Sequence, residues 1–496
     1  MTQTFRAPQP EARSWLGQLA AQALRDRGLL PEFPAAVLAQ ARAMRSPQRE
    51  GMANVDDLTA LPWCSIDNDD SRDLDQLSAC EALTDGACKL SVAVADVDAL
   101  VTKDSAIDQH AGANTASIYT SARIFPMLPE QLSAGLSSLN PGEDRLALVT
   151  DMVIAPDASI PSFKVRRAWV RNQAQLAYDS VSSWLEGRGP LPQPAMAVPG
   201  MDQQLRMQDD IAQRLRARRR AQGSLELETF APQAVFDGER VIDLRQQVHN
   251  RARQLIEELM IATNTCTASL LARHGGASLR RVVRSPERWQ RIINLARRYG
   301  ERLPQEPDSR ALEIFLANQH RADPLHFADL SLIVVKLMGA GEYVVESPTA
   351  LPIGHFGLAL RGYTHSTAPN RRYPDLISQR MVKSLLAGHA SPYSALELQH
   401  WAAHCTAQED AARKVERHMH KCEAAMYLST QIGRHFDAIV TGRTTGGTWV
   451  RLLSPPAEGM LLSALPDLDI GQQLRVRLVS TDAAQGFVDF ALSHQG

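Results

Sequence analysis

The chain has 496 residues, 44% of them hydrophobic and 22% charged, which is the composition of an ordinary globular protein with several domains. A formal net charge of −2 excludes a uniformly basic nucleic-acid-binding coat, although the 53 lysines and arginines leave room for a local basic channel. Six cysteines without a Cys-x-x-Cys pair exclude a disulfide scaffold and a zinc site.

Residues 1–58 are predicted to form a small helical module. Apolar residues recur at helical spacing between Trp15 and Leu24, and 33–43 gives a second apolar-faced segment. Such a module is either helix-turn-helix-like and touches nucleic acid, or a packing cap, which we favour slightly. The first six residues lack the apolar stretch of a secretory signal, and no run approaches the roughly 20 apolar residues of a membrane span. We therefore expect a cytoplasmic protein without a membrane partner.

Residues 64–76 carry the densest cluster of carboxylates in the chain. Five aspartates fall within nine positions, namely Asp67, Asp69, Asp70, Asp73 and Asp75. Carboxylates so close together repel one another and are costly to hold in a fold, unless cations lie between them. The apolar residues just upstream predict a strand that delivers them to one place, and a solvated acidic loop is the alternative.

The middle of the chain alternates predicted strands with long helices. We expect strands at 89–97, 146–154 and 163–170, and an extended loop at 119–129 where prolines disfavour helix. We expect helices at 201–222, 250–273, 285–299 and 396–427. The helix at 285–299 starts from the capping pattern Ser285-Pro286-Glu287-Arg288. The arginine run that ends the first helix, 214–220, is either a solvated face or a phosphate-binding rim.

Residues 355–380 form a second dense polar stretch, followed by a helix from Pro374. Its histidines, hydroxyls and arginines are typical of a site that binds phosphate and ribose. From residue 431 onwards the sequence predicts five short strands in about 60 residues, which indicates a small closed barrel of the OB kind. An SH3-like barrel without ligand is the alternative.

Four motifs occur in order: Ile-Asp-x5-Asp-Leu-Asp from Ile66, Ile-Phe-Pro-Met-Leu-Pro from Ile124, His-Phe-Gly-Leu-Ala-Leu from His355, and Tyr-Thr-His-x-Thr-x-Pro-x-Arg-Arg-Tyr-Pro-Asp-Leu from Tyr363. Together they resemble the catalytic domain of the RNase II/RNase R (RNB) family of exoribonucleases over roughly 60–430, and the C-terminal barrel resembles that family's S1-type RNA-binding domain. The expected fold is α+β and multidomain, with a helical module at 1–58, an RNB-type mixed sheet with helices at 59–430 and an OB barrel at 431–496.

The resemblance implies a hydrolytic, processive 3′-to-5′ exoribonuclease that degrades single-stranded RNA to nucleoside 5′-monophosphates with one or two Mg²⁺ ions. Asp67 and Asp73 would anchor metal, and Asp75 would hold the second ion or position the attacking water. Arg371 would neutralise charge in the transition state, so that Asp73, Asp75 and Arg371 are the catalytic candidates. The RNA-binding candidates are Tyr119, Arg371, Arg372, Glu257 or Glu258, Tyr363 and His365. We expect a monomer.

Three departures from the family pattern bear on function. Gln76 stands where the family has a fourth aspartate, and its neutral amide is at best a weak metal ligand, for which Asp69 or Asp70 would have to compensate. Ala-Pro-Asn-Arg, ending at Arg371, replaces Ser-Pro-Ile-Arg. The short N-terminal segment cannot hold the family's two cold-shock domains. A catalytically impaired RNA-binding protein is therefore the alternative function, and structured RNA with a 3′ overhang is an alternative substrate.

Overall fold

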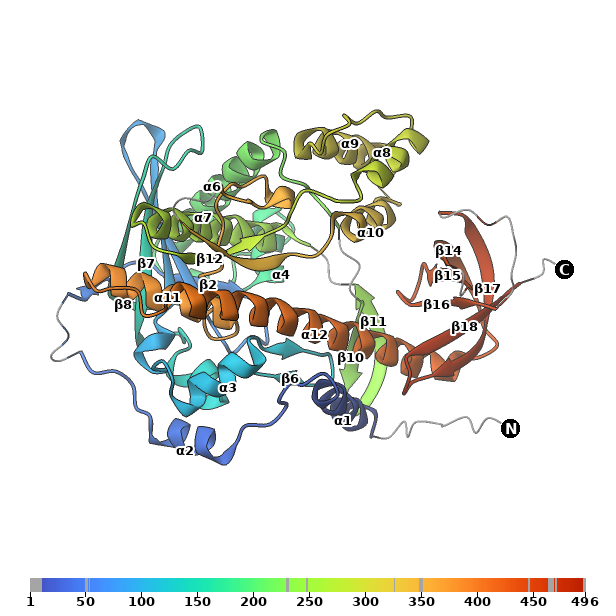
Figure 1. The fold of residues 1–496 in the computed structure, drawn as a ribbon, viewed down its shortest axis with the longest axis horizontal. Helices are drawn as coiled ribbons and strands as arrows, with labels where there is room; N and C mark the ends of the chain where they lie inside the picture. The colour runs from blue at the N-terminus through green and yellow to red at the C-terminus, as the bar shows by residue number, and fades with distance from the viewer. Residues whose placement is uncertain are drawn as a thin grey trace.

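The computed structural model describes residues 11–49, 52, 54–228, 232–246, 249–324, 326–347, 351–444, 447–462, 468 and 471–493. At its centre lies a seven-stranded mixed sheet with strand order β1-β8-β7-β4-β3-β2-β9 (Figure 1). The strands are β1 (Asp56–Asp57), β2 (Cys64–Asp67), β3 (Gln76–Ala82), β4 (Cys88–Ala95), β7 (Asp144–Ile154), β8 (Ser162–Arg171) and β9 (Ala174–Ala177). Pairing is antiparallel through the middle and parallel at both edges, where β1 meets β8 and β2 meets β9.

Both faces of this sheet are buried, which explains why β4 is apolar on both sides. Leu90, Val92 and Val94 belong to a core with α6 and α7, whereas Ala93 and Ala95 belong to a core with α3, α11 and α12. Strand residues alternate between faces, so a strand covered on both sides needs apolar residues at every position. The three predicted strands are confirmed, although β4 ends at Ala95 because a 3-10 turn follows it.

The helices are α1 (Ala12–Arg25), α2 (Ala35–Ala43), α3 (Ala106–Asn114), α4 (Tyr178–Leu185), α5 (Gln193–Met196), α6 (Met201–Ala221), α7 (Arg251–Arg273), α8 (Trp289–Arg298), α9 (Ser309–Ala322), α10 (Phe327–Met338), α11 (Tyr373–Leu386) and α12 (Ala395–Leu428). The predicted long helices are confirmed. The start of α8 is a correction, because the helix begins at Trp289 and Ser285 does not cap it. Pro286 disfavours helix at Ser285, and its carbonyl accepts the N–H of Trp289 in a turn instead.

The predicted loop at 119–129 is mostly extended, but it contains a small hairpin of β5 (Ile118–Tyr119) and β6 (Ile124–Phe125). Two further hairpins, likewise unpredicted, pair β10 (Pro232–Asp237) with β11 (Arg240–Gln246) and β12 (Ser278–Val282) with β13 (Glu342–Glu346). Each of them packs against α12, which crosses the molecule from the sheet to the C-terminal barrel (Figure 1).

The two N-terminal helices pack on different parts of the chain. The buried side of α1, including Leu16 and Leu24, joins a core with α12 and the β10–β11 hairpin. Val37 and Ala41 of α2 join the core of the sheet, and α2 lies against α3 (Figure 1). In a helix-turn-helix the two helices pack on each other. These contacts favour the packing-cap alternative.

The C-terminal strands form a closed five-stranded barrel with order β14-β15-β16-β18-β17. They are β14 (His435–Thr444), β15 (Gly447–Leu452), β16 (Glu458–Leu461), β17 (Gln473–Asp482) and β18 (Phe487–Leu492). Closure comes from the antiparallel pairing of β14 with β17, and β16 runs parallel to β18. This is the OB arrangement, so the barrel prediction is confirmed and the SH3-like alternative is not.

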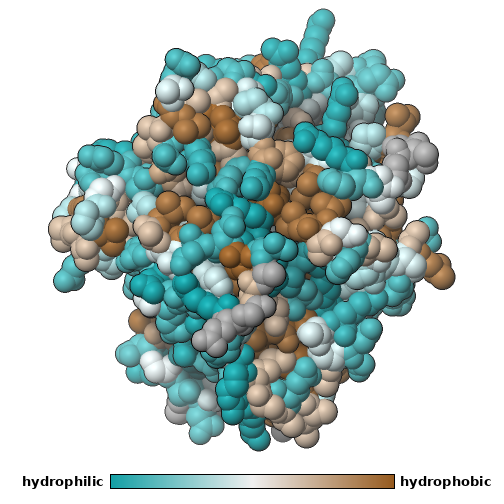
Figure 2. Space-filling view, turned by 90° about the vertical axis from the view of Figure 1, so that its left-hand side faces the viewer, coloured by the Kyte–Doolittle hydropathy of each residue, from teal (hydrophilic) through white to brown (hydrophobic). Residues whose placement is uncertain are grey.

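The architecture confirms the α+β, multidomain prediction. Among the described residues, none of the helices combines the length and apolar character needed to cross a membrane. On the face at the left of Figure 1, hydrophobic patches are separated by hydrophilic side chains (Figure 2).

Candidate active site

The aspartate stretch lies at neighbouring ends of two antiparallel strands. β2 ends at Asp67, and Asp75 directly precedes β3, where its carbonyl accepts the N–H of Ala95 at 2.9 Å. The loop that joins these two strands is held in place at the buried Leu74, whose N–H donates to the Ser138 hydroxyl at 3.0 Å. The predicted strand before the carboxylates is confirmed.

The five aspartates divide into two groups. Asp69 and Asp70 are exposed in the turn after β2. Asp67 and Asp73 are half-buried, and the side chain of Asp75 is only 1% exposed. Three carboxylates therefore point inward, and the two exposed ones are solvated as an ordinary acidic loop would be.

Arg371 lies in the loop before α11 and connects that loop to the aspartates. Its Nε donates to Asp75 Oδ2 at 3.0 Å, and the N–H of Asn370 donates to Asp75 Oδ1 at 2.9 Å. The Arg371 side chain is nevertheless 42% exposed, and its two Nη groups have no hydrogen-bond partner among the described residues. Asp75 thus holds Arg371 through Nε and leaves its two Nη groups available to a ligand.

The charges of this cluster act on one another. Burial raises the pKa of Asp75 to about 7, although the nearby Arg371 partly opposes the rise. Burial likewise raises the pKa of Asp67. Burial alone would lower the pKa of Arg371, but Asp75, Tyr119, Asp67 and Asp73 together raise it. The guanidinium therefore stays charged and lies within electrostatic reach of all three inward carboxylates.

Tyr119, at the end of β5, completes the cluster. Its hydroxyl donates to Asp73 Oδ2 at 3.0 Å, and the residue is 37% exposed. The ring therefore lies beside the carboxylates with part of its surface open. An open aromatic face at such a place is available for stacking by a nucleobase.

Asp67 and Asp73 are the carboxylates that could hold a metal ion. Asp67 Oδ1 accepts from Asn68 N–H and Ser71 Oγ, whereas Oδ2 has no partner among the described residues, and the same holds for Asp73 Oδ1. Mg²⁺ in nucleotide-processing sites is commonly held by one or two carboxylates, with substrate phosphates and water completing the octahedron. The donor set fits one such ion, although within the described residues no three His, Cys, Asp or Glu side chains gather as a metal site.

Gln76 lies apart from this donor pair. As the first residue of β3 it pairs with Val94, whose side chain faces the α6–α7 core, and it is buried. Asp75 pairs with Ala95, on the opposite face. The predicted role of Gln76 as a weak metal ligand thus gains no support from its placement and stays a prediction.

Tyr178, the first residue of α4, lies close to the aspartates and was not found from the sequence. Burial, followed by the charge of Asp67, raises its pKa. The guanidinium of Arg253 lies 4.4 Å from the centre of its ring and donates to Asn68 Oδ1 at 2.5 Å. The only sequence signal is an aromatic residue where β9 passes into a helix, which no periodicity distinguishes from a packing residue.

The structure separates Glu257 from Glu258. Glu258 is buried and its carboxylate accepts two hydrogen bonds from the Arg219 guanidinium, one of them at 2.8 Å. Glu257 is exposed, lies 3.3 Å from His249 Nε2 and is within electrostatic reach of Tyr363. Of the two candidates Glu257 is the exposed one, and its place near an RNA strand stays a prediction.

The arginine run at the end of α6 is occupied by partners within the chain. Arg214 pairs with Asp210, Arg216 and Arg220 with Glu226, Arg218 with Asp157, and Arg219 with Glu258. These contacts favour a structural, partly solvated face over a phosphate-binding rim.

Tyr363, His365 and Arg372 belong to the same segment as Arg371 and have partners within the chain. The hydroxyl of the buried Tyr363 accepts from Asn264 Nδ2 at 3.2 Å, and His365 Nδ1 lies 2.8 Å from the Tyr343 hydroxyl. Burial lowers the pKa of His365 well below its usual value, so the ring is neutral. Arg372 Nη2 donates to the buried Asp375 at 2.7 Å. Their placement suits support of the loop, and direct RNA contact stays a prediction.

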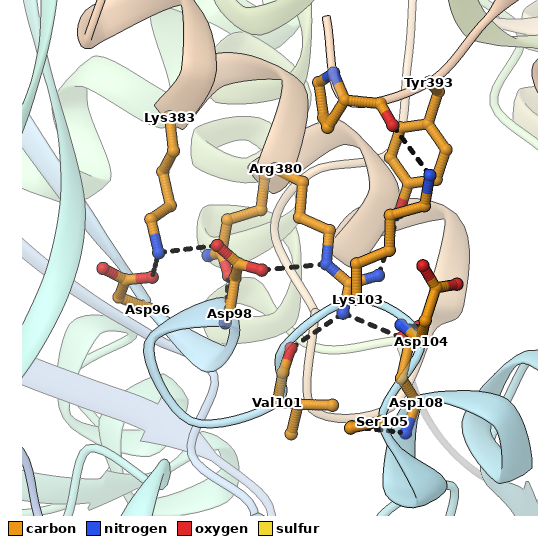
Figure 3. A network of polar contacts seen from close by, with 12 residues as sticks. Asp96, Asp98, Val101, Lys103, Asp104, Ser105, Asp108, Arg380, Lys383 and Tyr393 are labelled. Carbon is orange, nitrogen blue, oxygen red and sulfur yellow. Dashed lines mark hydrogen bonds and ion pairs between the residues drawn. The ribbon is translucent and has the colours of Figure 1, made fainter.

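A second network of aspartate and arginine anchors α11, the helix that follows this loop (Figure 3). Arg380 donates through Nε to Asp98, through Nη1 to the Tyr393 hydroxyl and through Nη2 to Asp108 and the Val101 carbonyl, at 2.7–2.9 Å. Lys383 bridges Asp98 and Asp96 at 2.7 Å. This network anchors α11, the helix that begins two residues after Arg371.

Comparison with known families and proteins agrees with this geometry. The family described as RNB domain matches residues 55–388, and the RNase II-type exonuclease C-terminal S1 domain matches 434–493. Ribonuclease R of Vibrio cholerae is 32% identical over 469 residues, covering 88% of this chain and 54% of that protein. Ribonuclease R of Escherichia coli K12 is 30% identical over 475 residues, covering 91% and 57%. The chain thus spans about half the length of these relatives.

Solved structures show the same likeness. RNase R of Mycoplasma genitalium in complex with ribose-methylated single-stranded RNA aligns with a TM-score of 0.85 and 25% identity, covering 96% of this chain and 77% of that one. The same enzyme in complex with double-stranded RNA aligns with a TM-score of 0.84. Yeast Ssd1, a pseudonuclease, aligns with a TM-score of 0.72 and 17% identity over 89% of this chain and 55% of that one, a likeness of fold alone.

Proposed function

The chain belongs to the RNB family, and on that premise we propose that it is a processive 3′-to-5′ exoribonuclease that hydrolyses single-stranded RNA to nucleoside 5′-monophosphates with Mg²⁺. The observation that carries the proposal is the contact of Asp75 with Nε of the partly exposed Arg371, with Asp67 and Asp73 close enough for their charges to raise its pKa. The relatives named Ribonuclease R and their RNA-bound structures support it.

Arg371 receives the phosphate next to the scissile bond. A guanidinium with both Nη groups unused can donate two parallel hydrogen bonds to phosphate oxygens. Asp75, bound to Nε, keeps the fork in one orientation, so little reorganisation is needed as charge develops on the phosphorane. Asp75 is thus proposed to act through Arg371, and its contact with a metal ion or with the attacking water stays a prediction.

Asp67 and Asp73 are proposed to hold Mg²⁺ through their unused oxygens. When bound, the ion would activate water near neutral pH and neutralise phosphate charge. The Tyr119 hydroxyl keeps Asp73 turned towards the cluster, and its ring is proposed to stack on a base near the 3′ end. Stacking of this kind is worth about 1–3 kcal/mol per base and is indifferent to sequence.

The alternative is a catalytically impaired RNA-binding protein of the same fold. The sequence pattern supports it, because Gln76 stands where the family has a fourth aspartate and a neutral amide does not carry the charge of a carboxylate. The retained aspartates and Arg371 favour the enzyme, since they still form one connected cluster.

Incubation of the full chain with 5′-labelled single-stranded RNA and Mg²⁺ separates the two functions. We expect progressive shortening from the 3′ end and release of nucleoside 5′-monophosphates, both strongly reduced in Asp75→Asn. An intact, shifted RNA band without shortening would establish the binding protein. A parallel duplex with a 3′ overhang tests whether structured RNA is also a substrate.

A further inference from the structure

The hairpin that carries Tyr119 is held on α12 by two glutamates. Glu416 Oε1 accepts the backbone N–H of Tyr119 at 3.2 Å, across 297 positions of sequence. Glu423, which is fully buried, accepts from Ser121 twice: from its N–H at 3.2 Å and from its hydroxyl at 2.8 Å. Both carboxylates therefore bind backbone groups of the hairpin, which a side-chain substitution in the hairpin itself would not remove.

These contacts leave Tyr119 fixed at two points. Its backbone is tied to α12 through Glu416, and its hydroxyl is tied to Asp73 in the catalytic cluster. Next to it, the Ser121 hydroxyl also accepts the N–H of Ala234 in β10, so the hairpin turn is clamped between α12 and a second hairpin. Two short strands of two residues each could not hold this position alone.

The same turns of α12 also carry the C-terminal barrel. The Cys422 thiol lies 3.7 Å from the Ala484 carbonyl, and Lys421 Nζ lies 5.4 Å from the centre of the Trp449 ring. Gly486 approaches so closely that an added Cβ would lie 3.1 Å from the Cys422 nitrogen. One helical segment thus connects the barrel with the aromatic residue beside the aspartates.

We propose that Glu416 and Glu423 are positioning residues that hold the Tyr119 ring beside the aspartate cluster and thereby set the length at which degradation stops. The inference rests on the proposed function, because it requires that Tyr119 stacks on RNA near the 3′ end. Neither glutamate touches the reacting atoms. A charged acceptor suits this role, since hydrogen bonds to ionised groups are stronger than neutral ones and orient the donor more firmly.

The test compares end-product ladders of full-length variants on a 5′-labelled homopolymer RNA. In Glu416→Ala we expect the shortest product to be replaced by a broader distribution of longer ones, shifted in the same direction as in Tyr119→Ala. Glu416→Gln, whose amide oxygen still accepts a hydrogen bond, should shift the ladder less. Ser121→Ala removes one of the two bonds to Glu423 while sparing its buried carboxylate, and should give a smaller shift of the same kind. Asp410→Asn is the matched control, because the exposed Asp410 of α12 pairs, within the described part of the chain, with Lys414 alone.

The double variant Tyr119→Ala/Glu416→Ala distinguishes positioning from general damage. If Glu416 acts through Tyr119, the double variant gives the ladder of Tyr119→Ala alone. A further shift in the double variant, or a wild-type ladder in Glu416→Ala and Glu416→Gln, would overturn the inference while wild-type degradation upholds the proposed function. A wild-type ladder in Tyr119→Ala would overturn the inference together with the stacking role.

Discussion

The cluster around Arg371 and the network around Arg380 are built from the same types of side chain, arginine, aspartate and tyrosine. Arg371 lies in the loop before α11, and Arg380, shown with its partners in Figure 3, lies in α11 itself. In the Arg380 network all three guanidinium nitrogens donate to acceptors within the chain, and the group is buried. In the other cluster only Nε of Arg371 has a partner among the described residues, and 42% of the side chain is exposed. The two clusters contain the same types of residue. They differ in how many guanidinium nitrogens of the arginine have a hydrogen-bond partner among the described residues.

This difference indicates that one cluster has a structural role and the other a functional role. Buried, fully paired charges hold elements in register, and removing one partner leaves an uncompensated charge inside. A charged group that is only partly paired but remains in contact with solvent carries a small free-energy cost. It can also bind a ligand of opposite charge. The Arg380 network therefore belongs to the fold, and Arg371 with Asp67 and Asp73 belongs to the proposed chemistry.

Asp75→Asn tests the functional side of the comparison and carries the largest expected effect. The substitution keeps the shape but weakens the hold on Arg371 Nε, so we expect cleavage to fall by about 10²–10⁴-fold. RNA affinity, measured by fluorescence anisotropy, should stay close to wild type because the Nη groups still face outward. A variant that cleaves at the wild-type rate would remove Asp75 from the proposed mechanism.

Arg380→Met tests the structural side. Breaking this buried pair should cost about 3–5 kcal/mol of stability, since Asp98 and Asp108 lose their shared partner. We expect a clear fall in Tm by differential scanning fluorimetry, with cleavage per folded molecule retained well below that Tm. Loss of cleavage at full stability would show that the network takes part in the chemistry, and the contrast with Arg371 would fail.

Asp67 and Asp69 show a similar contrast within the aspartate stretch, because Asp67 is half-buried whereas Asp69 is exposed. If Asp67 offers its free oxygen to Mg²⁺, Asp67→Asn should raise the Mg²⁺ concentration for half-maximal cleavage at least about tenfold, as changes close to a bound metal typically do. Asp69→Asn, the matched control, should leave it unchanged. Equal shifts in both variants would indicate a diffuse acidic surface instead of a site.

How much of the fold and of the site could be predicted from the sequence depends on how many positions separate the interacting residues. The strand before Asp67 followed from local apolar residues. The helix predicted at 250–273 begins one residue later, at Arg251, because Asn250 is its N-cap. The role of Glu416 could not be predicted, since its partner Tyr119 is 297 positions away. Glu257 and Glu258 are adjacent on one helix. They differ because Arg219 of α6, which is distant in sequence, donates a hydrogen bond to Glu258. Motifs located Arg371, but the exposure of its fork required the fold.

The smallest effect is expected for Arg218→Ala, which asks whether the arginine run on α6 binds RNA at all. Arg218 is half-buried, and its Nη1 donates to the Asp157 carboxylate at 3.0 Å and to the Asp157 carbonyl at 2.9 Å, so it is neither fully buried nor free. An exposed ion pair of this kind contributes little to stability, and we expect an unchanged Tm. If the run is a structural face, RNA affinity and its dependence on salt also stay unchanged. A phosphate-binding rim would instead weaken binding for all sequences and reduce the slope of log K against log salt by about one, since one phosphate contact would be lost. That result would add Arg218 to Arg371 among the arginines proposed to bind RNA.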